Sequence, residues 1–244
     1  MNTRHATIGA SLIFATGLMA QVTIGAKLGL NYTAISTSYT PEPTQKPDNP
    51  SGIGFHVGGY LQYNFTDAIG FRPELLYSLR GFQQNNTTTT SYTIFGSTTT
   101  TTTASKDNTG LSYLEIPLLL SFNLNEHLSF QAGPGLGLLM GGKVKSSGTS
   151  TTVTTDGSGT STSSSSAYDV TRSGSDVTKD LTKLEIGLCV GGIFELHNGL
   201  NFGLRYWRGL NTVNDKTDFG NGNTIKQYTN LLQISIGYSF VKPS

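Results

Sequence analysis

The chain has 244 residues, of which 13% are charged and 36% are hydrophobic, and it contains 30 glycines. Globular domains usually carry about 25% charged residues, so this composition is unusual. The formal net charge of +1 gives no electrostatic basis for nucleic acid as a partner, and the single cysteine, Cys189, excludes an intramolecular disulfide framework or a cysteine-rich zinc site.

The first segment is typical of an export signal. "MNTRH" is a short basic stretch, and it precedes "ATIGASLIFATGLMA", an apolar stretch that ends at Ala20. A membrane-spanning helix needs roughly 20 apolar residues, so this stretch is too short to be one. Residues 1–20 are therefore predicted to be a signal peptide, with a buried N-terminal helix as the alternative, and residues 21–244 the exported domain.

Eight later segments alternate apolar and polar residues with a period of two, which is typical of β-strands with two different faces. These segments are "VTIGAKLGLNY" (22–32), "GIGFHVGGYLQYNF" (52–65), "IGFRPELLYSLRG" (69–81), "LSYLEIPLLLSFNL" (111–124), "LSFQAGPGLGLLMGG" (128–142), "LTKLEIGLCVGGIFEL" (181–196), "LNFGLRYWRGLN" (200–211) and "NLLQISIGYSF" (230–240).

The connections between these segments alternate in length. Three are short turns, "TDA", "NEH" and "HNG", and four are long loops near 34–51, 83–109, 143–180 and 214–229. Ser/Thr tracts such as "GSGTSTSSSSAYD" (157–169) fall inside the second and third long loops. Short turns on one edge and long loops on the other predict an all-β fold: an eight-stranded antiparallel up-and-down transmembrane β-barrel with short periplasmic turns and long extracellular loops.

A soluble sandwich also alternates, but two features favour the membrane barrel. The apolar face is nearly uniform in every strand, with aromatic residues such as Tyr32, Phe122 and Tyr238 near strand ends, as in the lipid-facing band of a barrel. The opposite face carries mid-strand charges among many glycines. A narrow lumen accommodates both, because small residues allow strands to approach and charges can pair across the interior.

The lumen is predicted to hold a structural polar network. Six of its charges are Lys27, Arg72, Glu74, Glu115, Glu185 and Arg205, and His56 points to the same interior. The six charges sum to zero, and an eight-stranded interior is just wide enough for side chains. We therefore expect them to neutralise one another and to plug the barrel without a water-filled pathway.

These segments resemble the PorT-like outer-membrane β-barrel proteins of Bacteroidetes-type bacteria. The similarity lies in "GAKLGLN" (25–31), "RPELLYSLRG" (72–81), "YLEIPLLL" (113–120), "AGPGLG" (132–137), "GLRYWRGL" (203–210) and "IGYSF" (236–240). The resemblance implies an outer-membrane location and an eight-stranded barrel, but little about chemistry, since function does not transfer on fold alone. The chain departs from many outer-membrane barrels in ending with "VKPS" after Phe240.

Little in the sequence indicates catalysis, and we predict no catalytic, cofactor-binding or metal-binding residues. His56 with a loop Asp or Ser is the one arrangement that would suit a rim-sited enzyme, and a hydrogen-bonded lumen histidine is the simpler interpretation. Cys189 is expected to face the lumen as an inert thiol. Trp207 and Arg208 near a strand end are interpreted as an interfacial anchor.

Two functions are predicted from this arrangement. The first is a non-enzymatic structural or surface-binding barrel that contacts an extracellular ligand through its Ser/Thr-rich loops. The alternative is an accessory subunit of an envelope secretion or transport complex. A small-solute channel and an outer-membrane enzyme come third and fourth. In each case we expect outer-membrane lipid to be a partner and nucleic acid not to be one. Both termini are expected in the periplasm after signal-peptide removal.

Overall fold

The computed structural model describes residues 22–42, 50–214, 217–218, 220 and 222–241. The predicted signal peptide lies outside this part of the chain. So do residues 43–49 of the first predicted loop and residues 215–216, 219 and 221 of the fourth.

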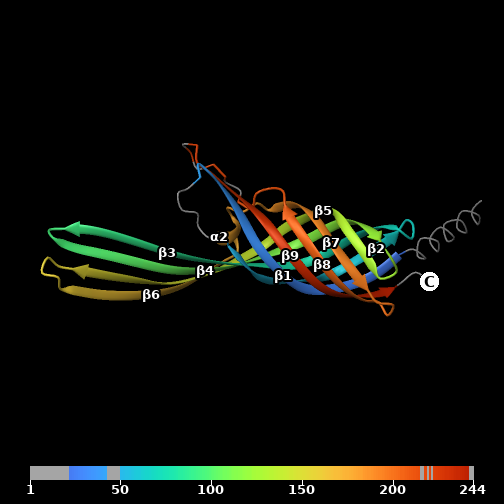
Figure 1. Cartoon of the computed structure of the whole chain (residues 1–244), viewed down its shortest axis with the longest axis horizontal. Coiled ribbons are helices and arrows are strands. Elements are labelled where there is room, and N and C mark those ends of the chain that lie inside the picture. Colours follow the sequence, from blue (N-terminus) through green and yellow to red (C-terminus); the bar gives the residue numbers. More distant parts are fainter. Residues whose placement is uncertain (1–21, 43–49, 215–216, 219, 221, 242–244) are drawn as a thin grey trace, which may run out of the picture.

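The described chain forms nine strands and one short helix, drawn in Figure 1. The strands are β1 (Val22–Thr40), β2 (Ser51–Asn64), β3 (Ile69–Ile94), β4 (Ser97–Asn123), β5 (Leu128–Thr155), β6 (Ser161–Ser173), β7 (Leu184–Glu195), β8 (Leu200–Gly209) and β9 (Thr224–Val241). The helix is α2 (Ser175–Thr178). None of the helical structure within the described residues is long and apolar enough to cross a membrane.

Eight of the strands close into a ring, so the predicted eight-stranded antiparallel barrel is confirmed. Neighbours pair in the order β1–β2–β3–β4–β5–β7–β8–β9, and β9 pairs back with β1. The short connections β2–β3, β4–β5 and β7–β8 lie at one end of the ring, called the turn end. The described ends of the chain, Val22 and Val241, lie there too, since Val22 pairs with Tyr63 and Val241 with Ile24. The opposite end is called the loop end.

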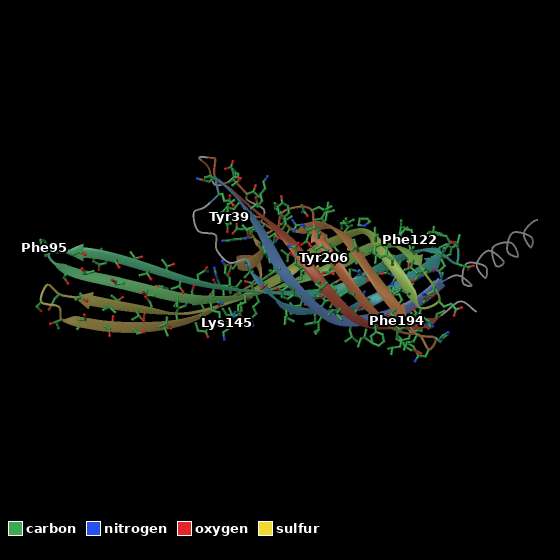
Figure 2. The ribbon with its side chains drawn as sticks, viewed as in Figure 1. Tyr39, Phe95, Phe122, Lys145, Phe194 and Tyr206 are labelled. Atoms are coloured by element: carbon green, nitrogen blue, oxygen red, sulfur yellow. The ribbon has the colours of Figure 1, made fainter. Side chains whose placement is uncertain are left out.

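The barrel has its apolar side chains outside and its polar side chains inside. Leu28 on β1 is 63% exposed, whereas the adjacent Lys27 is 6% exposed. Aromatic residues near strand ends, including Phe122, Phe194 and Tyr206 in Figure 2, project from the outer surface. Burying charge while exposing leucine costs free energy in water but suits a barrel whose outer wall contacts lipid.

The second and third long connections differ from the predicted loops, because most of their residues are β-strand. β3 and β4 stay paired as far as Ile94 and Ser97, and β5 continues to Thr155 before β6 returns beside it. Residues 84–107 and 146–170 thus form a four-stranded sheet, the projecting sheet, which extends away from the loop end (Figure 1). The physical reason is that threonine is β-branched and favours strands even when it is fully solvated.

Both tips of the projecting sheet are tight turns. Phe95 and Gly96 connect β3 to β4 with φ angles of 49° and 78°, and two successive positive φ values match the twist of a hairpin. At the β5–β6 tip, Asp156 Oδ1 accepts hydrogen bonds from the hydroxyl of Ser158 (2.6 Å) and from the backbone N–H of Thr160 (2.9 Å). These bonds, that from Ser158 foremost, lower the pKa of Asp156.

Candidate functional site: the barrel interior and the projecting sheet

All seven residues predicted for the lumen network lie inside the barrel. Their exposed fractions are between 0 and 6%, and they are Lys27, His56, Arg72, Glu74, Glu115, Glu185 and Arg205. The strand period explains this placement, because alternate residues of a strand point to the same side of the sheet. The register between strands then sorts the charged residues into two clusters.

The first cluster is centred on Glu74 of β3. Its carboxylate accepts from Lys27 Nζ (2.9 Å) and from both terminal nitrogens of Arg205 (2.7 and 2.8 Å). Arg72 Nε is 3.2 Å from the same group, and the Arg72 guanidinium lies 3.5 Å from the centroid of the Tyr60 ring. Three cations therefore share one carboxylate, which leaves this cluster with a formal excess of two positive charges.

The second cluster lies nearer the loop end and is centred on Arg80, which the predicted network omitted. Arg80 donates to Glu115 Oε1 (2.8 and 3.0 Å) and to Glu185 Oε2 (2.8 Å), and its guanidinium lies over the Tyr113 ring at 4.2 Å. Arg80 shares the strand face of Arg72, so alternation alone was sufficient to find it. Arg80 adds a fourth cation to the six predicted charges, which themselves sum to zero, so these seven buried groups together carry a formal charge of +1.

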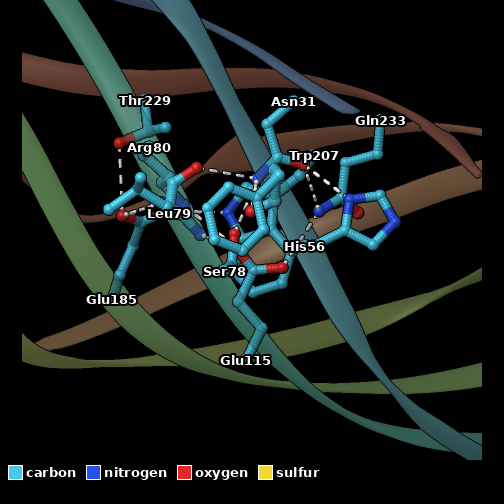
Figure 3. A network of polar contacts seen from close by, with 11 residues as sticks. Asn31, His56, Ser78, Leu79, Arg80, Glu115, Glu185, Trp207, Thr229 and Gln233 are labelled. Atoms are coloured by element: carbon cyan, nitrogen blue, oxygen red, sulfur yellow. Dashed lines mark hydrogen bonds and ion pairs between the residues drawn. The ribbon is translucent and has the colours of Figure 1, made fainter. Parts of the chain in front are cut away.

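A layer of amide side chains links the histidine to the Glu115 carboxylate of the second cluster, as Figure 3 shows. Asn31 Nδ2 donates to the carbonyls of Phe55 and Leu79 at 3.0 Å, which fixes its Oδ1 as an acceptor. His56 Nδ1–H then donates to that oxygen (2.7 Å), and Gln233 Nε2 donates both to it (3.2 Å) and to Glu115 (3.1 Å). His56 is thus oriented by an amide oxygen rather than by the carboxylate that a general base would use.

Trp207 is part of this interior, so its interpretation as an interfacial anchor is wrong. Its side chain is fully buried, and its Nε1–H donates to Glu185 Oε1 (2.7 Å). The ring lies against Gly187 and Gly135, where a Cβ atom would collide with it. The indole therefore occupies space that the two glycines leave open. Arg208, by contrast, does lie toward the rim, where it donates to Asn230 (2.6 Å).

Trp207 is the chain's single tryptophan, so its fluorescence reports on the barrel interior. We expect blue-shifted emission that neither iodide in water nor brominated acyl chains in the bilayer quench strongly, because the indole touches neither phase. Gly187→Val should displace the ring and red-shift the emission. Strong quenching of the wild-type fluorescence by brominated lipid would instead indicate that Trp207 lies at the membrane interface.

The projecting sheet presents two hydroxyl-rich faces to solvent (Figure 2). On the face that continues the barrel interior, Thr99 pairs with Thr154 (3.2 Å) and Thr101 with Thr152 (3.1 Å). Thr–Thr pairs of this kind stabilise neighbouring strands. The opposite face, which continues the lipid-facing surface, carries similar pairs, among them Ser91–Thr100 (2.9 Å) and Thr93–Thr98 (3.0 Å).

Aromatic side chains distinguish one of these faces. Tyr92 pairs across the strands with Thr99, and Tyr168 pairs with Gly148. Both tyrosines lie on the face that continues the interior, called here the tyrosine face, and they are 55% and 41% exposed. Sequence reasoning missed these aromatic residues, because segments expected to be loops have no defined faces.

Metal ligands and the single thiol were two further candidates for chemistry in the described residues. Within them, no group of three or more His, Cys, Asp or Glu residues is arranged to hold a metal ion. Cys189 is fully buried beside Leu119, Trp207 and Leu231, as expected for a packing residue rather than a nucleophile.

An apolar outer wall around an ion-paired interior defines a small transmembrane β-barrel. The chain belongs to the outer membrane protein beta-barrel domain family, whose model matches residues 14–215, and the family places it in the bacterial outer membrane. No curated protein matches the chain.

Several solved barrels are similar to the chain. The attachment invasion locus protein Ail of Yersinia pestis is 13% identical with a TM-score of 0.35, covering 90% of this chain and 99% of its own. Neisserial surface protein A is 12% identical with a TM-score of 0.33, covering 89% and 97%. OprG from Pseudomonas aeruginosa is 11% identical with a TM-score of 0.31, covering 90% and 97%. At these scores the similarity says nothing about function.

Proposed function

We propose that the protein is a non-enzymatic outer-membrane barrel that displays the projecting sheet as a binding surface for carbohydrate polymers outside the cell. The observation that carries this proposal is the sheet itself. It is about as long as the barrel strands that support it, and its solvent-facing side chains are mostly hydroxyls held in regular rows. In this proposal the loop end faces outward, and the turn end, with both chain termini, faces the periplasm after removal of residues 1–20.

The chemistry of the tyrosine face supports a carbohydrate ligand. Neighbouring strands lie about 4.8 Å apart, and alternate residues along a strand about 6.6 Å apart, so the face is a grid of paired donors and acceptors. Hydroxyls of this kind exchange hydrogen bonds with sugar hydroxyls. Tyr92 and Tyr168 add exposed rings that can lie flat against the apolar faces of sugar rings, and the Tyr168 side chain lies over Gly148.

In this proposal the barrel anchors the projecting sheet in the outer membrane. Its interior is filled by Arg80, Tyr113 and Trp207, each no more than 2% exposed, and the ion pairs hold these side chains in place. A closed lumen leaves the projecting sheet as the part of the described chain with a large accessible polar surface.

The test compares intact cells that produce the full chain with cells that produce a shortened chain. Gln84 pairs with Asp107, and Ser146 pairs with Val170, so an Asn-Gly turn can replace the residues between each pair without disturbing the barrel. We expect cells with the full chain to retain neutral polysaccharide from a labelled panel and cells with the shortened barrel not to. Heat-modifiable electrophoretic mobility confirms that both barrels fold.

A matched pair of variants locates the binding face. Tyr92→Ala with Tyr168→Ala should weaken retention about tenfold, from the loss of two aromatic contacts. Thr89→Ala with Thr102→Ala, on the opposite face, should leave retention unchanged. Equal retention by the shortened barrel would contradict the proposal.

A second candidate, an accessory subunit of an envelope secretion or transport complex, is favoured by one observation. Among the described residues, the outer edges of β3 beyond Gln83 and of β6 have no neighbouring strand, and such edges accept a strand from a partner protein. Purification of the full chain and of the shortened barrel in mild detergent distinguishes the two candidates. An envelope protein that copurifies stoichiometrically with the full chain, but not with the shortened barrel, supports the accessory role.

A further inference from the structure

Three lysines lie together on the outer surface where the projecting sheet leaves the barrel. Lys143 pairs with Gly110, Lys145 pairs with Asn108, and Lys106 pairs with Ser147. Residues that pair across strands share a face, so the three side chains project from the same side of β4 and β5. Lys145 is an alternate or diagonal neighbour of each of the other two lysines, at about 7 Å, whereas Lys106 and Lys143 lie about 14 Å apart. All three are exposed, and Figure 2 labels Lys145 at this point.

This face continues directly into the lipid-facing wall. Toward the turn end from Lys143, the same two strands place Gly141 opposite Ser112 and Leu138 opposite Leu114. Met140 is 66% exposed and Leu138 38% exposed. The lysines therefore begin where the apolar band ends, at the level of the lipid headgroups.

A groove of about 680 Å³ runs beside the lysines. Lys143 and Lys145 line one side, and Ile53 and Leu79 line the other. Gly81, Gly110 and Gly141 contribute no side chains to its floor. The groove thus joins a basic end to an apolar end that opens on the lipid-facing wall.

The charge around the groove is predominantly positive. Asp169 lies on the same face and pairs with Lys145 at 3.3 Å, but both side chains are more than half exposed, and such exposed pairs are weak. Asp107 lies on the opposite face, since it neighbours Lys106 along the strand. The three lysines and one aspartate leave a formal charge of +2. The turns at the other end of the barrel, 65–68, 124–127 and 196–199, contain Asp67 and Glu126 and no lysine or arginine.

We propose that Lys106, Lys143 and Lys145 bind the phosphate headgroup of an anionic membrane lipid, one of whose acyl chains follows the groove toward Leu79. The shared face with the apolar band favours a lipid over a soluble phosphate, because a soluble anion would gain nothing from the apolar end. This inference goes beyond the proposed carbohydrate-binding function, since the tyrosine face lies on the other side of the sheet.

The test uses the full chain in neutral detergent micelles with fluorescent diphosphoryl lipid A as the probe. Each lysine near an anionic headgroup contributes about a fivefold gain in affinity, so Lys106→Gln, Lys143→Gln and Lys145→Gln together should weaken binding about a hundredfold. Each single variant should weaken it about fivefold, which keeps the test valid if the triple variant folds poorly. The control is Lys179→Gln, an exposed lysine at the C-cap of α2.

Two further measurements distinguish a lipid site from a general anion site. Under this proposal we expect phosphate-free lipid A to bind no more tightly to the wild type than to the triple variant, and millimolar inorganic phosphate to displace little probe. Equal binding of diphosphoryl lipid A by the wild type and the folded triple variant would overturn it. Full displacement by inorganic phosphate would also overturn it, because the site would then recognise the ion alone.

Discussion

Replacing Glu74 with Gln is expected to lower the free energy of unfolding by about 3–5 kcal/mol. Lys27, Arg72 and Arg205 all contact this carboxylate, and all are at most 6% exposed. The amide keeps the shape of the side chain but removes the only negative charge in the cluster. Three buried cations would then face one another without an anion, and buried charges that lose their partner are strongly destabilising.

The measurement is urea unfolding of the full chain in phospholipid vesicles, followed by Trp207 fluorescence and by electrophoretic mobility. Glu126→Gln is the control, since the Glu126 side chain is 87% exposed and its contact with His197 is long, at 3.7 Å. That variant should change stability by less than about 0.5 kcal/mol.

A double-mutant cycle tests the assigned cause. Arg205→Met should destabilise the wild type strongly, because it removes the bidentate partner of Glu74. In the Glu74→Gln background the same change removes one of the uncompensated cations and should cost much less. Additive effects of the two changes would mean that the cluster does not act through charge pairing.

The interior was largely predictable from sequence because strand alternation decides which side chains point inward. Lys27, Arg72 and Glu74 each fall on the polar face of an alternating segment, and the barrel places them accordingly. Which charges meet was not predictable, since Glu74 and Arg205 lie 131 residues apart and their contact depends on strand register. That register follows from turn geometry and packing around the whole ring.

The position of Trp207 was predicted wrongly because its place near a strand end was given more weight than its strand parity. An aromatic residue near a strand end favours an interfacial position, yet Trp207 is two residues from Arg205 and so shares its inward face. Strand parity was the stronger indication. Only the structure shows the further reason, which is that Gly135 and Gly187 on neighbouring strands leave space for the indole.

The strands of the projecting sheet were not predicted because their Ser/Thr-rich composition shows no alternation of apolar and polar residues. Alternation between apolar and polar residues disappears when nearly every residue is Ser or Thr, as in 97–103, so a period of two gives no signal there. The strand propensity of threonine and the turn at Phe95–Gly96 were the available indications. Neither identifies which strands pair, and the pairing of β5 with both β4 and β6 beyond the barrel came from the structure.

The barrel is expected to conduct no steady ion current, and this is an all-or-none effect. The Glu74 cluster, the amide layer around Asn31 and the Arg80 cluster succeed one another along the interior. Eight strands leave an interior only as wide as its side chains. A hydrated ion would have to displace paired charges to pass, and those pairs are anchored on several different strands.

Planar-bilayer recording of the purified full chain tests most directly whether the barrel is a closed support for the projecting sheet. Electrophoretic mobility of the same preparation verifies that the barrel is folded. We predict a flat baseline in molar potassium chloride, with no long-lived steps at either polarity. Large, stable single-channel steps of uniform size, retained when the projecting sheet is removed, would show an open lumen and contradict a closed barrel.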